Sequence, residues 1–500
     1  MPDNTEPPAW GDNHWRHDMK KFAMRASALA VLALCQPVFA GEIDDLKAEI
    51  AAQKAAEAAQ QARLDALEQR LNAVTAAAAK PAPATSPAMA TDQNGGKIDP
   101  NANGVSLYSN SNTSLHIYGL VEATGSHANH QTAGGGSVTG AQVSWFSGNR
   151  LGFDADHALA VGQQIGLPDL KVIAKLETEF ELPTGDMDTG NVFFNRDAWM
   201  GFYAKDLGKI TLGRQNTLTR DFTQNWGDAY GTPDVTLKEG GYSNVNNFKQ
   251  FIFYSGGANG TRLNSAIEWK KKFGDHILAG LGFAFGSQGA GGSGDVGNGG
   301  SVPGDFKKGQ TQEASIALNS VEVGPGLLSA NLSYDRANVN DLIHQSELIG
   351  GNYRVGMFRV NGGYVHYTAE QGLGNSAGTR TDNSWTVSMS LLPTPENEFA
   401  LGFNEMKGKN AGFSGGGTIL NPFGSTAGVS ATAANGSKKA IFGSYMYHVD
   451  RQLDVYLAAD HFKVDGDWVI GDAQGNGNHF GAGNAYNAET EVAVGARYKF

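Results

Sequence analysis

The feature that most constrains this chain is an alternation of apolar and polar side chains that begins near Ser114 and continues to Phe500. From Leu170 to Glu181, for example, aliphatic residues interleave with lysine and glutamate. A period of two is typical of β-strands with one apolar face, and segments of about ten residues match a tilted strand that crosses a bilayer. Because an open sheet edge would leave backbone groups unpaired in lipid, the alternation predicts an all-β transmembrane barrel.

The number and spacing of the predicted strands support this interpretation. Short connections such as 206–208 and 393–396 alternate with long ones such as 287–311 and 464–489, which are rich in glycine, serine and asparagine. This asymmetry is typical of periplasmic turns and extracellular loops, and single-chain bacterial barrels have an even number of antiparallel strands. The sixteen predicted strands are 114–125, 142–156, 169–182, 192–204, 208–215, 261–273, 276–286, 312–322, 326–336, 343–354, 357–368, 380–392, 397–407, 438–448, 452–463 and 490–500.

Aromatic residues are expected where such strands cross the membrane interfaces, because their rings prefer the headgroup level. The candidates are Tyr118, Trp145, Trp199, Tyr203, Trp269, Tyr447 and Tyr498. One connection is unusually long: residues 216–260 separate the fifth and sixth predicted strands. Loops beyond about 15 residues are usually functional, and a sixteen-stranded barrel encloses an aqueous hole. We therefore expect this loop to fold inward and narrow the lumen.

Composition excludes several other classes of protein. The chain has 38 Lys and Arg against 50 Asp and Glu, a net charge of −12, so a nucleic-acid partner is not expected. A single cysteine rules out a disulfide framework. No phosphate-binding glycine loop, nucleophile elbow or metalloprotease motif is present, so neither an enzyme nor a cofactor is expected. His127 and His130 lack a third metal ligand, and Asp465, Asp467 and Asp472 lack the rest of a calcium-binding pattern.

Residues 1–40 have the layout of an export leader. Met19-Lys20-Lys21 starts a basic region, 26–34 is a short apolar stretch, and Val38-Phe39-Ala40 provides small residues at a cleavage point. Translation is expected to start at Met19, because the segment before it is polar. Leu34 before Cys35 disfavours a lipoprotein signal. Cleavage after Ala40 would leave an exported chain without cysteine.

A heptad pattern and a linker separate this leader from the barrel. Between Ile43 and Val74 apolar residues recur at a/d positions, with a polar middle formed by Gln53, Glu57 and Gln60. The pattern predicts a coiled-coil helix over 41–79 that needs partner helices; a single solvated helix is the alternative. Residues 80–113 are rich in Ala, Pro, Gly and Asn and read as a linker. The barrel is then expected over 114–500.

Ordered motifs in the barrel region give it a resemblance to a known family. They are Ile117-Tyr118-Gly119, Asn149-Arg150-Leu151-Gly152-Phe153, Lys175-Leu176-Glu177, Phe194-Asn195-Arg196-Asp197-Ala198-Trp199-Met200-Gly201, Leu212-Gly213-Arg214-Gln215, Arg262-Leu263-Asn264-Ser265 and the terminal Tyr498-Lys499-Phe500. In these the chain resembles the Gram-negative trimeric porins. The resemblance implies a homotrimer in outer-membrane lipid, inserted by the barrel-assembly machinery through the C-terminal strand that ends at Phe500.

The resemblance also implies the pore residues, which are basic residues on the wall facing acids on the infolded loop. The basic candidates are Arg150, Arg196 and Arg262, and the acidic candidates are Asp221, Asp228, Asp234 and Glu239. Strand parity independently places Arg150 inward, since Leu151 and Phe153 fall on the lipid face, and Arg262 inward, since Leu263, Ile267 and Trp269 do. The same parity places Asp197 outward. Each arginine has an alternative role as a salt bridge that pins the wall.

Two further groups of charged residues are assigned by parity. Arg214 falls on the outward side beside Ile210 and Leu212, which favours a place at a subunit interface. Lys175, Glu177 and Glu179 are lumen-wall candidates, either as ion pairs of the wall or as part of the pore.

The resulting functional hypothesis is a water-filled outer-membrane porin for passive diffusion of small hydrophilic solutes and ions, with some anion preference. A coiled coil of this kind looks like that of certain dicarboxylate-specific porins, so one alternative is a channel selective for dicarboxylates or similar anions. Another is a structural or adhesive envelope protein whose coiled coil makes periplasmic contacts while the barrel only anchors it.

Overall fold

The structure is a computed structural model of the chain. It divides into two compact units, Met1–Ala88 and Met89–Phe500. It describes Lys54 and residues 104–131, 135–142, 144–187, 192–223, 262–285, 310–339, 342–370, 379–411, 434–466 and 488–500. The leader over 1–40, the coiled coil over 41–79 (apart from Lys54) and the linker up to 103 lie outside the described residues, so these three predictions stay predictions.

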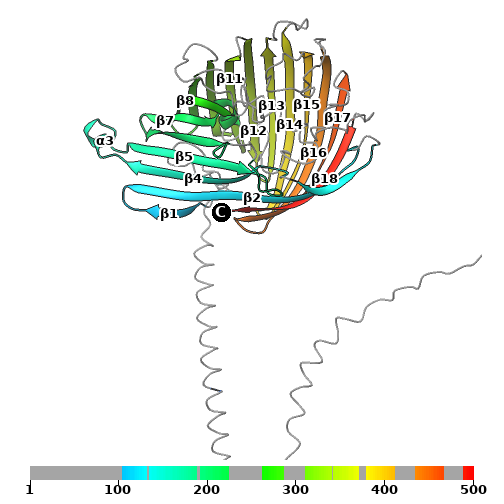
Figure 1. Cartoon of the computed structure of the whole chain (residues 1–500), viewed down its shortest axis with the longest axis horizontal. Helices are drawn as coiled ribbons and strands as arrows, with labels where there is room; N and C mark the ends of the chain where they lie inside the picture. Colours follow the sequence, from blue (N-terminus) through cyan, green and yellow to red (C-terminus); the bar gives the residue numbers. More distant parts are fainter. Residues whose placement is uncertain are drawn as a thin grey trace, which may run out of the picture. The chain divides into compact units, whose positions relative to one another are not determined.

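Sixteen antiparallel strands close into a barrel, as the alternation predicts. Each pairs with the next barrel strand along the chain, and the last, β18, pairs with the first, β2, from Glu491↔Ala128 to Lys499↔Leu120 (Figure 1). The barrel strands are β2 (Thr113–Ala128), β4 (Asn149–Ala158), β5 (Lys171–Phe180), β6 (Asp197–Ala204), β7 (Gly208–Asn216), β8 (Arg262–Phe273), β9 (Ile277–Ala284), β10 (Thr311–Val323), β11 (Gly326–Val339), β12 (Leu342–Val355), β13 (Phe358–Ala369), β14 (Arg380–Thr394), β15 (Asn397–Ala411), β16 (Ala434–His448), β17 (Leu453–Gly466) and β18 (Ala488–Lys499).

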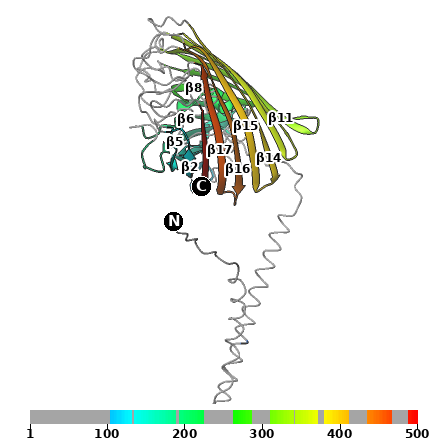
Figure 2. The ribbon, with the colours of Figure 1, turned by 90° about the vertical axis from the view of Figure 1, so that its right-hand side faces the viewer.

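Apolar side chains point out of this barrel and polar side chains point into it. On β14, which pairs with β13 and β15 and is labelled beside β15 in Figure 2, Val387 and Met389 are more than two-fifths exposed. Thr386 and Ser388, which alternate with them, are only 3 % exposed. An apolar outer face and a polar interior are the arrangement of a transmembrane β-barrel. Among the described residues, no helix is both long enough and apolar enough to span a membrane.

The second predicted strand, 142–156, is wrong at its start. The chain first forms a short strand, β3 (Val138–Gln142), which pairs with the far end of β2, and β4 begins only at Asn149. Between them the backbone leaves the sheet, because the Glu122 carboxylate accepts hydrogen bonds from the N–H groups of Trp145, Phe146 and Ser147 at 2.6, 2.9 and 3.2 Å. A local carboxylate thus replaces the ladder partners that these N–H groups would otherwise have.

One other boundary and four aromatic assignments also differ from expectation. Residues of the predicted linker form β1 (Val105–Ser109), which pairs with the start of β2. Tyr447 and Tyr498 are exposed on the outer face as expected, at 39 % and 46 %. Tyr118 and Trp145 are not at the membrane surface: both are buried, at 5 % and 2 % exposed, because Tyr118 bonds to Glu177 and Trp145 packs in a buried cluster. Trp199 and Tyr203 of β6 also face inward, in register with Lys175 and Lys171 of β5.

The long segment after β7 begins by folding inward, as expected. The short helix α4 (Leu218–Phe222) follows the N-cap Thr217, whose side chain accepts a hydrogen bond from the Arg220 N–H. Its Leu218 and Phe222 are fully buried against Leu278 of β9 and Ala317 of β10, on the inner face of the wall. A second short helix, α3 (Val161–Gln164), lies in the connection from β4 to β5. Residues 224–261 lie outside the described part.

Candidate functional site

Glu177 is the centre of a charged network on the inner face of β5. It is 3 % exposed and lies in register between Gly152 of β4 and Asp197 of β6. The Tyr118 hydroxyl donates to its carboxylate at 2.6 Å, and the Lys175 ammonium lies 3.3 Å away. Gly152 is required here, because a Cβ at that position would collide with the Tyr118 ring. The predicted lumen-wall residues Lys175, Glu177 and Glu179 therefore face the interior together.

Arg196 joins this network from the loop just before β6. Its guanidinium pairs with the carboxylates of both Glu177 and Glu179, and its backbone N–H donates to the Glu177 carbonyl at 3.2 Å. Because Arg196 precedes the first paired residue of β6, strand parity does not govern its side chain. Arg196 therefore forms ion pairs with acids of the barrel wall, which is the alternative role given above, a salt bridge that stabilises the wall.

The prediction that Asp197 faces outward is wrong. Asp197 is 4 % exposed, and its carboxylate lies 3.2 Å from Lys175. Met200 and Phe202 are the exposed outward residues of β6, so the inward set is Asp197, Trp199 and Gly201.

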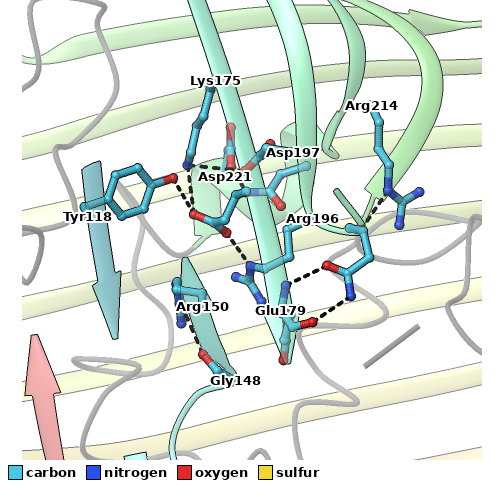
Figure 3. A network of polar contacts seen from close by, with 12 residues as sticks. Tyr118, Gly148, Arg150, Lys175, Glu179, Arg196, Asp197, Arg214 and Asp221 are labelled. Carbon is cyan, nitrogen blue, oxygen red and sulfur yellow. Dashed lines mark hydrogen bonds and ion pairs between the residues drawn. The ribbon is translucent and has the colours of Figure 1, made fainter. Parts of the chain in front are cut away.

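Arg150 lies on the same inner face, in register with Glu179, and is half-buried. Its Nε donates to the Gly148 carbonyl at 3.2 Å (Figure 3). Together with Lys175 and Arg196 it gives this part of the wall three cations, which lie beside the three acids Glu177, Glu179 and Asp197. Figure 3 shows Lys175, Arg196 and Arg150 in order along this network, with Tyr118 beside it.

The loop acid that the structure describes has a different partner from the one expected. Asp221 lies in α4, where it pairs with Lys270 of β8 and accepts from the Asn216 amide at 2.9 Å. Lys270 also lies 2.8 Å from Glu268, a buried residue on its own strand. Burial alone would raise the pKa of Asp221, but the charge of Lys270 and these hydrogen bonds bring it below its ordinary value. Asp228, Asp234 and Glu239 lie outside the described residues.

Arg262 differs from the other two arginines in its surroundings. It is the first residue of β8, lies in register with Asn216 and is 5 % exposed. The parity argument for its direction is wrong: Leu263 is fully buried with Ala266 and Ala284 and does not face lipid, because an extra residue of β8 shifts the register between Ala266 and Leu263. Within the described part of the chain, its Nε and Nη2 atoms are buried and have no hydrogen-bond partner. A buried guanidinium with unmet donors has a strong preference for an anion.

Arg214 is covered within the subunit. It is 9 % exposed; its Nε donates to the Asn195 carbonyl and its Nη1 to the Asn264 side chain, both at 2.7 Å. The extra residue of the register shift lies on β8, between Ala266 and Leu263, and Arg214 keeps regular register with Ala198 of β6, so parity still places it on the side of Leu212. Its place at a subunit interface stays a prediction. Phe500 exchanges backbone hydrogen bonds with Gly119 at 2.8 and 3.0 Å, which fixes the C-terminus on β2.

Two sets of residues were missed by the sequence reasoning. Glu268 and Lys270 alternate with the outward Ile267 and Trp269, so parity marks them as inward, but nothing in the sequence pairs them with Asp221. A buried acidic group, Asp460, Glu489 and Glu491, has carboxylate oxygens within 4.8 Å of one another inside β17 and β18. His127 and His130, the weak metal candidates, bond instead to Thr139 and to the Ala488 carbonyl, each at 2.6 Å.

Comparison with known proteins relates the chain to one family. A family model described as Gram-negative porin matches residues 73–467. The anion-selective porin from Comamonas acidovorans has a similar structure, with 21 % identity and a TM-score of 0.53 over 78 % of this chain and 100 % of that one. The outer membrane channel DcaP of Acinetobacter baumannii matches with 13 % identity and a TM-score of 0.49 over 79 % and 100 %. No curated protein sequence matches this chain.

Proposed function

Because this chain belongs to the Gram-negative porin family and is a passive channel of the outer membrane, we propose that its lumen favours small hydrophilic anions over cations. The observation that carries the proposal is Arg262, whose buried Nε and Nη2 have no hydrogen-bond partner among the described residues. Lys175 and Arg196, in contrast, already contact wall carboxylates.

The net charge of −12 does not argue against this preference. Selectivity in a channel depends on the charges that line its narrow part, not on the sum over the chain. Many of the acids are already paired with lysine or arginine, as Asp221 is with Lys270 and Asp382 with Arg380. An anion that reaches Arg262 would therefore meet a donor with unmet hydrogen bonds.

Reversal potentials in planar bilayers test the proposal. Under a KCl gradient the wild-type channel should give a potential of anion-selective sign, and Arg262→Gln should move it toward cations. Arg336→Gln is the matched control, since Arg336 lies on the lipid-facing side of β11 beside the exposed Tyr334. A cation-selective wild type, or an Arg262→Gln channel with an unchanged potential, contradicts the proposal.

We also propose that the channel is a homotrimer whose N-terminal helices form a periplasmic coiled coil. The barrel-assembly machinery would recognise the C-terminal strand, which ends at Phe500. The heptad pattern between Ile43 and Val74 supports the assembly. Deletion of 43–74 should lower the yield or the heat resistance of trimers on native electrophoresis. Full retention of both would contradict a role for the coiled coil.

A further inference from the structure

Residues 144–148, in the connection between β3 and β4, are buried although they belong to neither strand. Trp145 and Phe146 are 2 % and 1 % exposed. Both rings belong to a buried apolar cluster whose other members come from four strands that are distant in the sequence, β15 to β18. These members are Ala400, Met446, Tyr456, Ala458 and Ala493.

The strand residues of this cluster point into the barrel. Their neighbours along the strands, Leu401, Leu457 and Val494, are all more than half exposed on the outer face. Successive side chains of a strand point to opposite faces of the sheet, so the cluster members beside them lie on the inner face. The rings of Trp145 and Phe146 therefore lie inside the barrel, against the inner wall formed by β15 to β18.

The wall at this place has the shape and polarity to receive two rings. Three of its five cluster positions are alanine, and the Phe146 ring packs edge to face on Tyr456 with ring centroids 4.8 Å apart. A Cβ at Gly495 would collide with the Tyr456 hydroxyl, so glycine leaves room for this tyrosine. An apolar patch on the wall of an aqueous lumen is unfavourable unless something covers it, and the two rings cover this one.

Glu122 holds the backbone of the segment at a distance from the wall. This residue of β2 is fully buried, and its carboxylate accepts the N–H groups of residues 145–147. The Tyr456 hydroxyl donates to the same carboxylate at 2.8 Å. Because the glutamate side chain lies between the β2 backbone and the segment, the segment takes up part of the cross-section of the lumen.

Arg497 of β18 fixes the segment from a second side. It is the register partner of Glu122, and its Nε lies 3.2 Å from the Glu122 carboxylate. Its Nη2 donates to the Ser147 hydroxyl at 3.1 Å, and its guanidinium carbon lies 6.0 Å from the centre of the Phe146 ring. Hydrogen bonds to charged groups are stronger than those between neutral groups, so the segment is a fixed part of the lumen.

The segment and α4 lie against different walls of the barrel. α4 packs on β9 and β10, whereas the rings of the segment pack on β15 to β18. From β10 to β18 there are eight steps along the sixteen-strand circuit, which is half of it. The segment ends at Gly148, whose carbonyl accepts from Arg150 (Figure 3), so it also positions an arginine of the inner wall.

We propose that residues 144–148 form a constriction of the channel opposite α4 and thereby limit the size of the solutes that pass. For an uncharged solute, passage through a pore depends on the diameter of its narrow part, so a fixed segment that reduces the cross-section sets an upper size. This inference goes beyond the proposed anion preference and does not rest on it; it requires only that the barrel is a passive channel.

The swelling of liposomes that contain the purified channel tests the constriction, with arabinose and the larger raffinose as uncharged probes. The wild type should admit arabinose much faster than raffinose. The double variant Trp145→Ala/Phe146→Ala removes both rings from the lumen and should raise the ratio of raffinose to arabinose rates severalfold, together with the single-channel conductance. Phe146→Leu keeps an apolar side chain and should fall between. The matched control is Tyr447→Ala, which removes an exposed ring from the outer face of β16 and should keep the wild-type ratio.

The outcomes separate the constriction from folding and from charge selectivity. Heat-modifiable migration on electrophoresis shows which variants have folded, and Phe146→Leu decides the matter if the double variant does not fold. An unchanged sugar ratio in the folded variants overturns the constriction, and so does a wild type that admits raffinose as fast as arabinose. Because the sugars carry no charge, a raised ratio supports the constriction even if the reversal potentials contradict the anion preference.

Discussion

Removal of the Glu177 charge should make the channel more anion-selective without unfolding it. Glu177 is the acid shared by Tyr118, Lys175 and Arg196. In Glu177→Gln each cation keeps a second acid, since Lys175 stays beside Asp197 at 3.2 Å and Arg196 stays beside Glu179. The amide can still accept the Tyr118 hydrogen bond. The balance of three cations and three acids in this part of the wall therefore becomes one net positive charge.

The size of the effect follows from Coulomb's law. A unit charge about 7 Å from an ion in a water-filled lumen changes the energy of that ion by about 0.6 kcal/mol. Screening at 0.1 M salt, where the Debye length is about 10 Å, reduces this to about 0.3 kcal/mol. Because the anion is stabilised and the cation is destabilised, the two effects add to about 0.6 kcal/mol. The ratio of anion to cation permeability should therefore rise roughly threefold.

The assay is the reversal potential across planar bilayers at 0.1 M mean salt. The measurement is repeated at 1 M salt, where screening should nearly remove the effect. Glu347→Gln is the matched control, because Glu347 is exposed on the outer side of β12, in register with the exposed Tyr334 of β11. An unchanged potential in folded Glu177→Gln channels would refute the reasoning, and so would a shift of the same size in Glu347→Gln.

Three further perturbations test other parts of the structure. Arg214→Ala removes two buried hydrogen bonds of 2.7 Å and should lower the free energy of unfolding in urea by about 3 kcal/mol; a loss below about 0.5 kcal/mol would contradict its buried role. Gly280→Leu should reduce single-channel conductance, because even a Cβ there lies 3.0 Å from the Phe222 ring and the larger side chain would push α4 into the lumen. Conductance equal to that of the wild type would contradict this displacement of α4. The pKa of Asp221 is lowered in the folded protein, so its ion pair with Lys270 stabilises α4 fully at a pH above the ordinary pKa of an aspartate. This stabilisation is lost only as the pH falls through the lowered pKa of Asp221. Hydrogen exchange of residues 218–222, corrected for intrinsic rates, should therefore stay slow at pH 4. In Asp221→Asn it should be fast at every pH, and equal protection in both proteins would refute the anchor.

Most of the wall of this barrel could be predicted from the sequence. Lipid on one side and water on the other force a period of two, so all sixteen strands could be predicted, although β4 and β6 begin at Asn149 and Asp197 and not at 142 and 192. The same period tells which face a residue is on within a regular strand, as it does for Arg150.

The failures occur where the strand is interrupted or has not begun. Arg196 precedes β6 and an extra residue of β8 lies between Ala266 and Leu263, so parity misplaced Asp197 and Leu263. The backbone around Trp145 leaves the sheet because it bonds the Glu122 carboxylate, a contact between segments more than twenty residues apart that no local pattern reveals. Parity also names no partners: it could not show that Asp221 of the inward loop would meet Lys270 and not an arginine.

The central claim is that basic groups on the inner wall give an outer-membrane channel a preference for anions. The sign of the reversal potential of the purified wild-type protein, in a planar bilayer under a KCl gradient, tests it most directly. The account predicts an open channel with a potential of anion-selective sign. A potential of cation-selective sign, or no conductance from folded protein, would contradict it.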